Sequence, residues 1–238
     1  MANEQRSISL SGNCLKVLAA ISMVIDHTGM LIFPENEILR IIGRLAFPIF
    51  SFMICEGCKY TKKPLDYLLR ILILGIVTTA VSAFATGELY FNSLITFSCS
   101  ILLILLLFEA KKRNDRASKV ACLLLCVGCT ASFWLFAKRF TVDYGFFGIM
   151  LPVFPCISEI LFPAKKEKIL LFDPRFWAFG AGLLILSLDI GWIQPYCLLS
   201  LVPLALYNGQ RGFRLPKYSF YVFYPLHMVI IYLLSMII

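Results

Sequence analysis

The chain of 238 residues is 60% hydrophobic and carries a net charge of +8, from 22 Lys and Arg against 14 Asp and Glu. Soluble domains contain about 45–50% apolar residues, so this composition, with a mean hydropathy of +0.84, excludes an ordinary soluble domain. Membrane proteins collect Lys and Arg in their cytoplasmic loops, beside anionic lipid. The positive charge therefore requires no nucleic-acid partner.

Nine apolar runs follow one another along the chain, separated by short polar turns. A helix needs about 20 apolar residues to span the hydrocarbon core of a bilayer. The runs are 15–33, 38–57, 66–86, 92–109, 117–137, 142–162, 169–188, 192–208 and 218–238. We therefore expect one all-α, polytopic membrane domain, residues 1–238, with about nine transmembrane helices.

The basic residues predict the orientation of these runs, because cytoplasmic connections are enriched in Lys and Arg. The N-terminal tail and the even-numbered connections hold 17 Lys and Arg. The odd-numbered connections and the C-terminus hold only Lys138 and Arg139. We expect a multi-pass protein of the inner (cytoplasmic) membrane, with its N-terminus in the cytoplasm and its C-terminus outside.

Asp26 and His27 stand side by side inside the first apolar run. An ionisable residue near the centre of a membrane helix costs about 2.5–3.5 kcal/mol on insertion scales, so it is retained mainly where it has a partner or a function. The second run brings Arg40 and Arg44, which share one helix face at i and i+4. At about 1.5 Å of rise per residue, Asp26, His27 and Arg44 all lie roughly 9–11 Å below the outer surface. These groups at similar depth predict proton-transfer chemistry inside the membrane.

Further polar residues could join this buried site. Asp143 and Tyr144 open the sixth run from its outer end, and His227 lies roughly 13 Å into the last run. Alternatives remain open for several of these residues. Asp143 could cap a helix N-terminus, His227 could be a hydrogen-bonded core residue, and Arg40 could reach to the membrane surface.

Near the predicted inner surface, Glu56 and Arg70 lie on consecutive runs, and we expect them to form a structural ion pair. Cys55 and Cys58, two of nine cysteines, have C-x-x-C spacing at the cytoplasmic end of a run. Cytoplasmic thiols stay reduced, and a free cysteine in an apolar helix behaves as a small apolar residue. With two histidines and no dense cluster of metal-ligating residues, we expect no metal site.

Several short strings, taken in order, resemble the TraX family. They are LKV at 15–17, IDH at 25–27, IGRLAFPIF at 42–50, EG at 56–57, YLLR at 67–70, VDYGFFG at 142–148, YNGQRG at 207–212 and FYVFYPLH at 220–227. The resemblance covers most of the chain, from Leu15 to the last run. The stretches 86–141 and 155–191 match in hydropathy alone.

This resemblance implies an integral membrane acyltransferase, similar to distant relatives that move acyl groups from cytosolic coenzyme A to envelope acceptors. The type member acetylates the N-terminal amine of conjugative pilin at the inner membrane. We therefore expect this chain to transfer acetyl from cytosolic acetyl-CoA to an amine or hydroxyl of an envelope or pilin-like acceptor.

Roles for the buried residues follow from this expectation. His27 would act as the general base on the acceptor, because an imidazole titrates close to working pH. Asp26 is too close in sequence for an easy contact with that ring, so it would pair with Arg44 or position the acceptor. Arg44 would stabilise the oxyanion that forms when the thioester carbonyl is attacked.

The other candidates divide between the two substrates. The acceptor would contact the remaining polar residues of the buried site, Arg40, Asp143, Tyr144 and His227. On the cytoplasmic side, the expected coenzyme A site consists of Arg70, Arg211, Lys217 and Asn208, because Arg and Lys commonly bind phosphates.

Two other functional classes remain open. A proton-coupled transporter would also use a buried Asp/His/Arg set near the midplane. Such transporters usually contain repeated halves, and the sequence shows none. An assembly or scaffold protein would hold these charges for structural reasons alone.

Overall fold

The computed structural model describes residues 9–163, 170–189, 191–216 and 218–237, and this part of the chain folds as helices without a β-sheet. The α-helices are α1 (Gly12–Leu31), α2 (Glu37–Gly43), α3 (Ala46–Tyr60), α4 (Pro64–Thr86), α5 (Ser93–Lys112), α6 (Arg116–Arg139), α7 (Gly145–Met150), α8 (Val153–Leu161), α9 (Pro174–Asp189), α10 (Leu201–Ala205) and α11 (Ser219–Ser235). Two short 3₁₀ segments, η1 (Leu170–Phe172) and η2 (Gln194–Ser200), precede α9 and α10. The all-α prediction is confirmed for these residues.

Among the described residues, five helical segments are long and apolar enough to cross a membrane, and they coincide with the first five predicted runs. They are Gly12–Leu31, Glu37–Tyr60, Pro64–Thr86, Ser93–Lys112 and Arg116–Arg139. The last four runs also fold as helices, but as shorter pieces formed by α7 with α8, α9, η2 with α10, and α11. The count of nine crossings and the orientation in a membrane therefore stay predictions.

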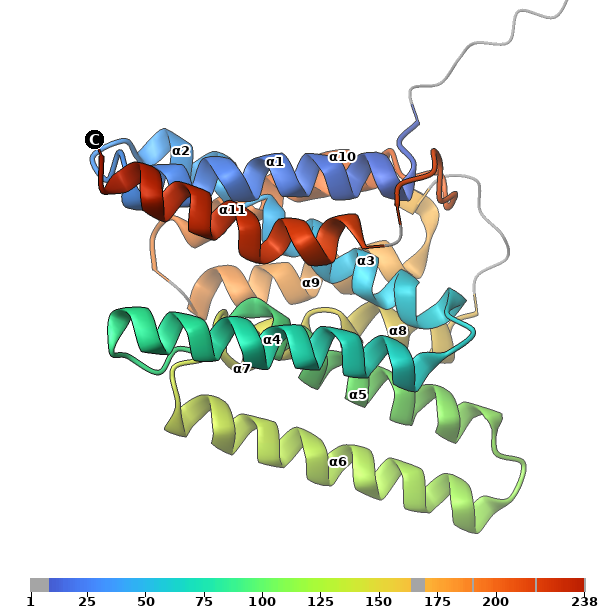
Figure 1. Cartoon of the computed structure of the whole chain (residues 1–238). Helices are drawn as coiled ribbons and strands as arrows, with labels where there is room; N and C mark the ends of the chain where they lie inside the picture. Colours follow the sequence, from blue (N-terminus) through green and yellow to red (C-terminus); the bar gives the residue numbers. More distant parts are fainter. Residues whose placement is uncertain (1–8, 164–169, 190, 217, 238) are drawn as a thin grey trace, which may run out of the picture.

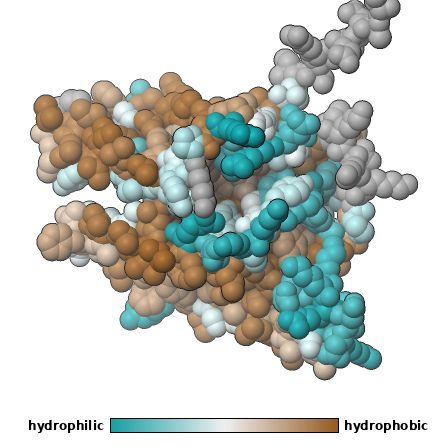
Figure 2. Space-filling view, turned by 45° about the vertical axis from the view of Figure 1, so that its right-hand side comes forward, coloured by the Kyte–Doolittle hydropathy of each residue, from teal (hydrophilic) through white to brown (hydrophobic). Residues whose placement is uncertain are grey.

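The nine segments alternate in direction between the two ends of the molecule (Figure 1). The N-terminal end of α1, the C-terminal end of α8 and the connections after α3, α5 and α10 lie at one end, on the right of the view. The C-terminus and the other connections lie at the opposite end. The described parts of the connections that are rich in basic residues thus lie together at one end, which we call the inner end. Figure 2 shows hydrophilic residues gathered on this side as it comes forward, beside broad apolar surface.

The second predicted run is divided between α2 and α3. Pro48 accounts for the break, because a proline ring clashes with the carbonyl four residues earlier, here that of Arg44. The helix begins again at Ala46 and carries Pro48 in its first turn, where the missing N–H is tolerated. The break leaves Arg44 at a corner, from which its side chain reaches α1.

The core lies where α3, α5 and α9 meet, and its largest side chains are fully enclosed. Phe52 on α3, Ile101 on α5 and Phe179 on α9 are at most 1% exposed. In contrast, α6 lies at the edge of the bundle (Figure 1) and buries Cys126 alone among its residues. Leu124 and Val127 on α6 are each 67% exposed, which suits a helix that faces lipid.

The expected ion pair between Glu56 and Arg70 is wrong. Glu56 instead binds Arg175, with 2.6 Å between Oε1 and Nη1, and accepts a hydrogen bond from the Tyr207 hydroxyl at 3.0 Å. Arg70 donates from Nε to the carbonyl oxygen of Asp66, one turn earlier on α4, at 3.0 Å. Glu56 lies on the side of α3 that faces the start of α9. The prediction failed because it chose the partner from the next helix along the chain.

Candidate active site

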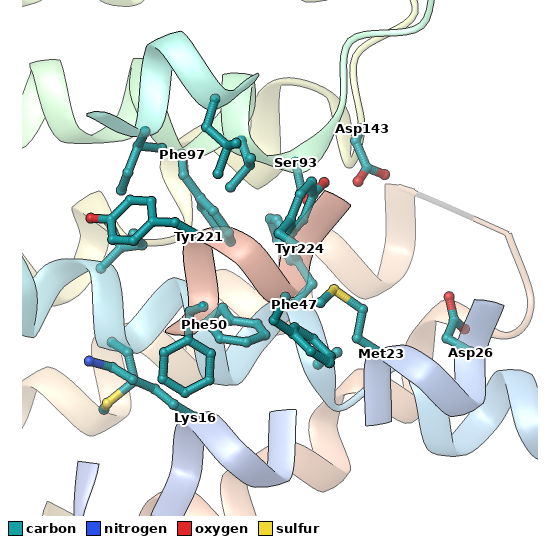
Figure 3. Close-up of a pocket in the computed structure, with 18 of the residues that line it drawn as sticks. Lys16, Met23, Asp26, Phe47, Phe50, Ser93, Phe97, Asp143, Tyr221 and Tyr224 are labelled. Carbon is teal, nitrogen blue, oxygen red and sulfur yellow. The ribbon is translucent and has the colours of Figure 1, made fainter. Parts of the chain in front are cut away.

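A cavity of about 310 Å³ lies between α1, α3, α4, α5 and α11. Its long wall is apolar and aromatic, and Figure 3 shows Phe47, Phe50, Phe97, Tyr221 and Tyr224 around it. Polar residues line its two ends. Near the inner end these are Asn13, Lys16 and Arg211, and near the other end they are Asp26, His27, Asp143 and Tyr144. The cavity thus joins the inner end of the bundle to the buried Asp-His pair.

Asp26 is held by two arginines. Its Oδ1 lies 2.7 Å from Arg44 Nη2, and its Oδ2 lies 2.9 Å from Arg40 Nη1. Arg44 Nη2 also donates to Oδ2 at 2.8 Å, and Arg44 Nη1 donates to Gln194 Oε1 at 3.4 Å. The expected contact between Asp26 and Arg44 is confirmed. Arg40 binds the same carboxylate, so it does not simply extend to the surface.

Gly43 allows this close approach between α1 and α2. A Cβ atom built at position 43 would lie 2.1 Å from Asp26 Oδ1 and 2.2 Å from Asp26 Cβ. Any side chain at this position would therefore push α2 away from Asp26. The glycine between Ile42 and Arg44 is explained by this contact with the carboxylate.

His27 contacts the second histidine rather than the neighbouring carboxylate. Its Nδ1 lies 2.9 Å from His227 Nε2, and His227 Nδ1 lies 3.0 Å from the carbonyl oxygen of Phe223. A carbonyl oxygen can only accept, so His227 carries its proton on Nδ1 and its lone pair on Nε2 when neutral. Nδ1 of His27 then donates to His227 Nε2, which leaves the lone pair of His27 on Nε2.

Aromatic packing fixes the orientation of His227, which is 5% exposed. The Phe223 ring stacks on it at 4.9 Å between centroids and 10° between planes, and the Tyr224 ring meets it at 5.9 Å and 69°. His227 is not among the residues that line the cavity, whereas His27 is. His227 therefore lies behind His27 as seen from the cavity. This position favours a contact with the His27 ring over a contact with the acceptor.

Asp143 and Tyr144 reach the cavity from the connection between α6 and α7. The Tyr90 hydroxyl donates to Asp143 Oδ1 at 2.8 Å. Tyr144 has a φ of 60°, an uncommon conformation for a residue with a side chain, and its ring stacks on Phe47 at 3.6 Å. Asp143 does not cap α7, because the residue before that helix is Tyr144 and no side chain caps it.

The four residues expected to bind coenzyme A are placed differently from one another. Arg211 lines the inner part of the cavity. Arg70 lies 6.0 Å from the ring centroid of Tyr221, which also lines it. Asn208 folds its own loop, because its Oδ1 accepts the backbone N–H of Gln210 at 2.9 Å. Lys217 lies outside the described residues.

Sequence reasoning missed several polar residues around the cavity, among them Lys16, Tyr90 and Gln194. Lys16 lines its inner part, Tyr90 binds Asp143, and Gln194 binds Arg44. Lys16 precedes the buried part of the first run and belongs to the string LKV at 15–17, neither of which indicates a role in the site. Tyr90 and Gln194 stand in stretches without a recognisable motif, so only the tertiary contacts reveal them.

Comparison with known proteins adds the family. A family model described as TraX protein matches residues 11–235. The chain belongs to the TraX family. The match includes every residue of the cavity described above, and the family prediction is confirmed.

Two relatives match this TraX chain over very different lengths. The chain is 26% identical over 253 aligned residues to the probable fimbrial assembly protein FimC, serogroup H1, of Dichelobacter nodosus, covering 95% of this chain and 96% of that protein. It is 46% identical over 63 residues to the uncharacterized protein RP591 of Rickettsia prowazekii (strain Madrid E), covering 26% of this chain and 23% of that protein. No solved structure matches significantly.

Proposed function

We propose that the protein is an integral membrane acyltransferase that transfers acetyl from cytosolic acetyl-CoA to an amine or hydroxyl of an envelope or pilin-like acceptor. Membership of the TraX family and a full-length relative described as a fimbrial assembly protein support this class. The observation that carries the proposal is His27, which lines a cavity with its Nδ1 held by His227.

The hydrogen bond from Nδ1 suits His27 to act as a general base. His27 Nε2 takes the proton from the acceptor N–H or O–H as the acceptor atom attacks the thioester carbonyl. The carbon–sulfur bond then breaks, and the same proton passes from His27 to the departing sulfur of coenzyme A. The products are the acetylated acceptor and free coenzyme A thiol, and His27 returns to its starting state.

The charges beside His27 favour the negative transition state of this reaction. Asp26 contributes one negative charge, and Arg40 and Arg44 contribute two positive charges. Fixed positive charge in a site of low dielectric stabilises an oxyanion without reorganisation. Arg44 does not line the cavity, so we propose that it stabilises the oxyanion through its positive charge and not through a direct hydrogen bond. The hydroxyl of Tyr144, which does line it, is the candidate donor to the oxyanion.

Inverted membrane vesicles test the class of function. Vesicles with the protein and vesicles without it are supplied with acetyl-CoA labelled in the acetyl group, and label in envelope components is counted. The proposal predicts incorporation that requires the protein. A proton-coupled transporter instead predicts proton flux, measured with a pH-sensitive dye in the same vesicles, and no incorporation; that result would reject the acyltransferase.

Replacing His227 by alanine is expected to slow transfer by about 10- to 100-fold. The variant leaves the Nδ1 proton of His27 without an acceptor, and a buried donor without its partner costs ~1–3 kcal/mol. His227→Gln, which retains an acceptor oxygen, should recover part of the rate. The effect should fall on kcat more than on KM, and the pH profile should shift. Unchanged kinetics in His227→Ala would show that the two imidazoles do not act together.

A further inference from the structure

Two basic side chains meet at the inner part of the cavity from distant parts of the chain. Lys16 lies on α1, and Arg211 lies on the loop that follows α10. Backbone hydrogen bonds tie this loop to the start of α1: Gly12 N–H donates to the Gln210 carbonyl at 2.8 Å, and Asn13 N–H donates to the Arg211 carbonyl at 3.0 Å. The two positive charges are therefore held in one place by the fold.

Neither charge has a partner among the residues that the structure describes. The side chains of Lys16 and Arg211 form no ion pair and no hydrogen bond with another described residue. Lys16 is half-buried and Arg211 is exposed. The half-buried arginines Arg44 and Arg175, in contrast, bind Asp26 and Glu56. Two like charges side by side at a cavity repel one another unless an anion lies between them. Their arrangement suits a phosphate, which Arg and Lys bind by charge-assisted hydrogen bonds.

The distance from these charges to His27 is set by α1. Lys16 and His27 are eleven positions apart on this helix, which corresponds to about 16 Å. The arm of coenzyme A between its pyrophosphate and its thioester sulfur has about thirteen bonds, or about 16 Å at the ~1.2 Å per bond of an extended chain. The apolar and aromatic wall between them offers this slender, weakly polar arm a surface to pack on (Figure 3).

We propose that Lys16 and Arg211 bind the phosphates of the acyl-CoA nucleotide, so that the pantetheine arm follows the cavity and presents its thioester to His27. This assignment rests on the proposed acetyl transfer and deepens it. The chemistry recognised is phosphate at the membrane surface, and the source is the nucleotide of the donor. An anionic lipid headgroup is the other source of the same chemistry, and the experiment separates the two.

Titration calorimetry of the full-length protein in a neutral detergent tests this site with two probes. Acetyl-CoA carries the phosphates, whereas S-acetylpantetheine has the same arm and thioester without the nucleotide. Lys16→Ala is expected to weaken acetyl-CoA binding by tenfold or more and to leave S-acetylpantetheine binding unchanged. Lys16→Arg should bind acetyl-CoA as the wild type does. Arg214→Ala is the matched control, because this exposed arginine of the same loop does not line the cavity.

Each outcome decides between named possibilities. Equal weakening of both compounds in Lys16→Ala would mean a structural role, and unchanged binding of both would remove the phosphate site while donor binding stands. Wild-type protein that binds neither compound would contradict the proposed function itself. Acetyl-CoA binding that Lys16→Ala leaves unchanged, together with phosphatidylglycerol binding that the same variant weakens, would assign the charges to a lipid headgroup and overturn the proposal.

Discussion

Replacing His27 by alanine is expected to lower the rate of acetyl transfer by about 10²–10⁴-fold, the range that a general base contributes. His27 is the histidine that lines the cavity, and its Nδ1 is committed to His227. Its loss removes the proton acceptor without removing the charges around Asp26. Donor binding should change little, because the inner part of the cavity is untouched.

The rate is measured as acetyl label transferred by inverted vesicles that contain equal amounts of inserted protein. His27→Gln is the second variant, since a glutamine can still donate a hydrogen bond to His227 but cannot accept a proton at this pH. Thr28→Ala, one residue further along α1 and outside the cavity lining, is the control. A rate in both His27 variants within a few-fold of the wild type would remove His27 from the base role.

Asp26→Ala is expected to destabilise the protein by about 3–5 kcal/mol, the usual result of leaving a buried charge without its partner. Asp26 is 8% exposed, and two guanidinium groups depend on its carboxylate. Removing the acid leaves Arg40 and Arg44 close together with no anion between them. The repulsion and the lost hydrogen bonds add to one another.

Thermal unfolding in detergent measures this effect, and a double variant supplies the control. Asp26→Ala combined with Arg44→Leu should unfold at a higher temperature than Asp26→Ala alone, because it removes the more buried of the two unpaired charges and their mutual repulsion. If Asp26→Ala unfolds within a few degrees of the wild type, or if the double variant is the less stable, the account of this cluster is incorrect.

Much of the fold was predictable, because a bilayer accepts only a few arrangements of the backbone. The first five apolar runs fold as five long helical segments. Asp26 and Arg44, predicted to lie at similar depth, are in contact as expected. The later runs were harder to place. Asp173 and Pro174 are helix-start signals, and Asp173 Oδ1 accepts the Arg175 N–H at 2.8 Å, so α9 begins five residues after the predicted run.

The tertiary partners of the site were less accessible to sequence reasoning. His27 and His227 are 200 positions apart, and depth alone could not say that the last helix packs against the first. The pair of Glu56 and Arg70 failed for the opposite reason, since consecutive helices need not turn their charged faces towards one another. Which helices pack side by side depends on the whole bundle and not on any one segment.

In the proposed reaction, acetyl enters from the inner end of the cavity and remains in the membrane or envelope, whereas the coenzyme does not. Sealed vesicles of both orientations are given acetyl-CoA with one label on the acetyl group and another on the adenine. We expect vesicles with the cytoplasmic face outward to retain the acetyl label without the adenine label, and vesicles of the opposite orientation to retain neither. Equal retention from both faces, or retention of neither label by intact protein with envelope material present, would contradict it.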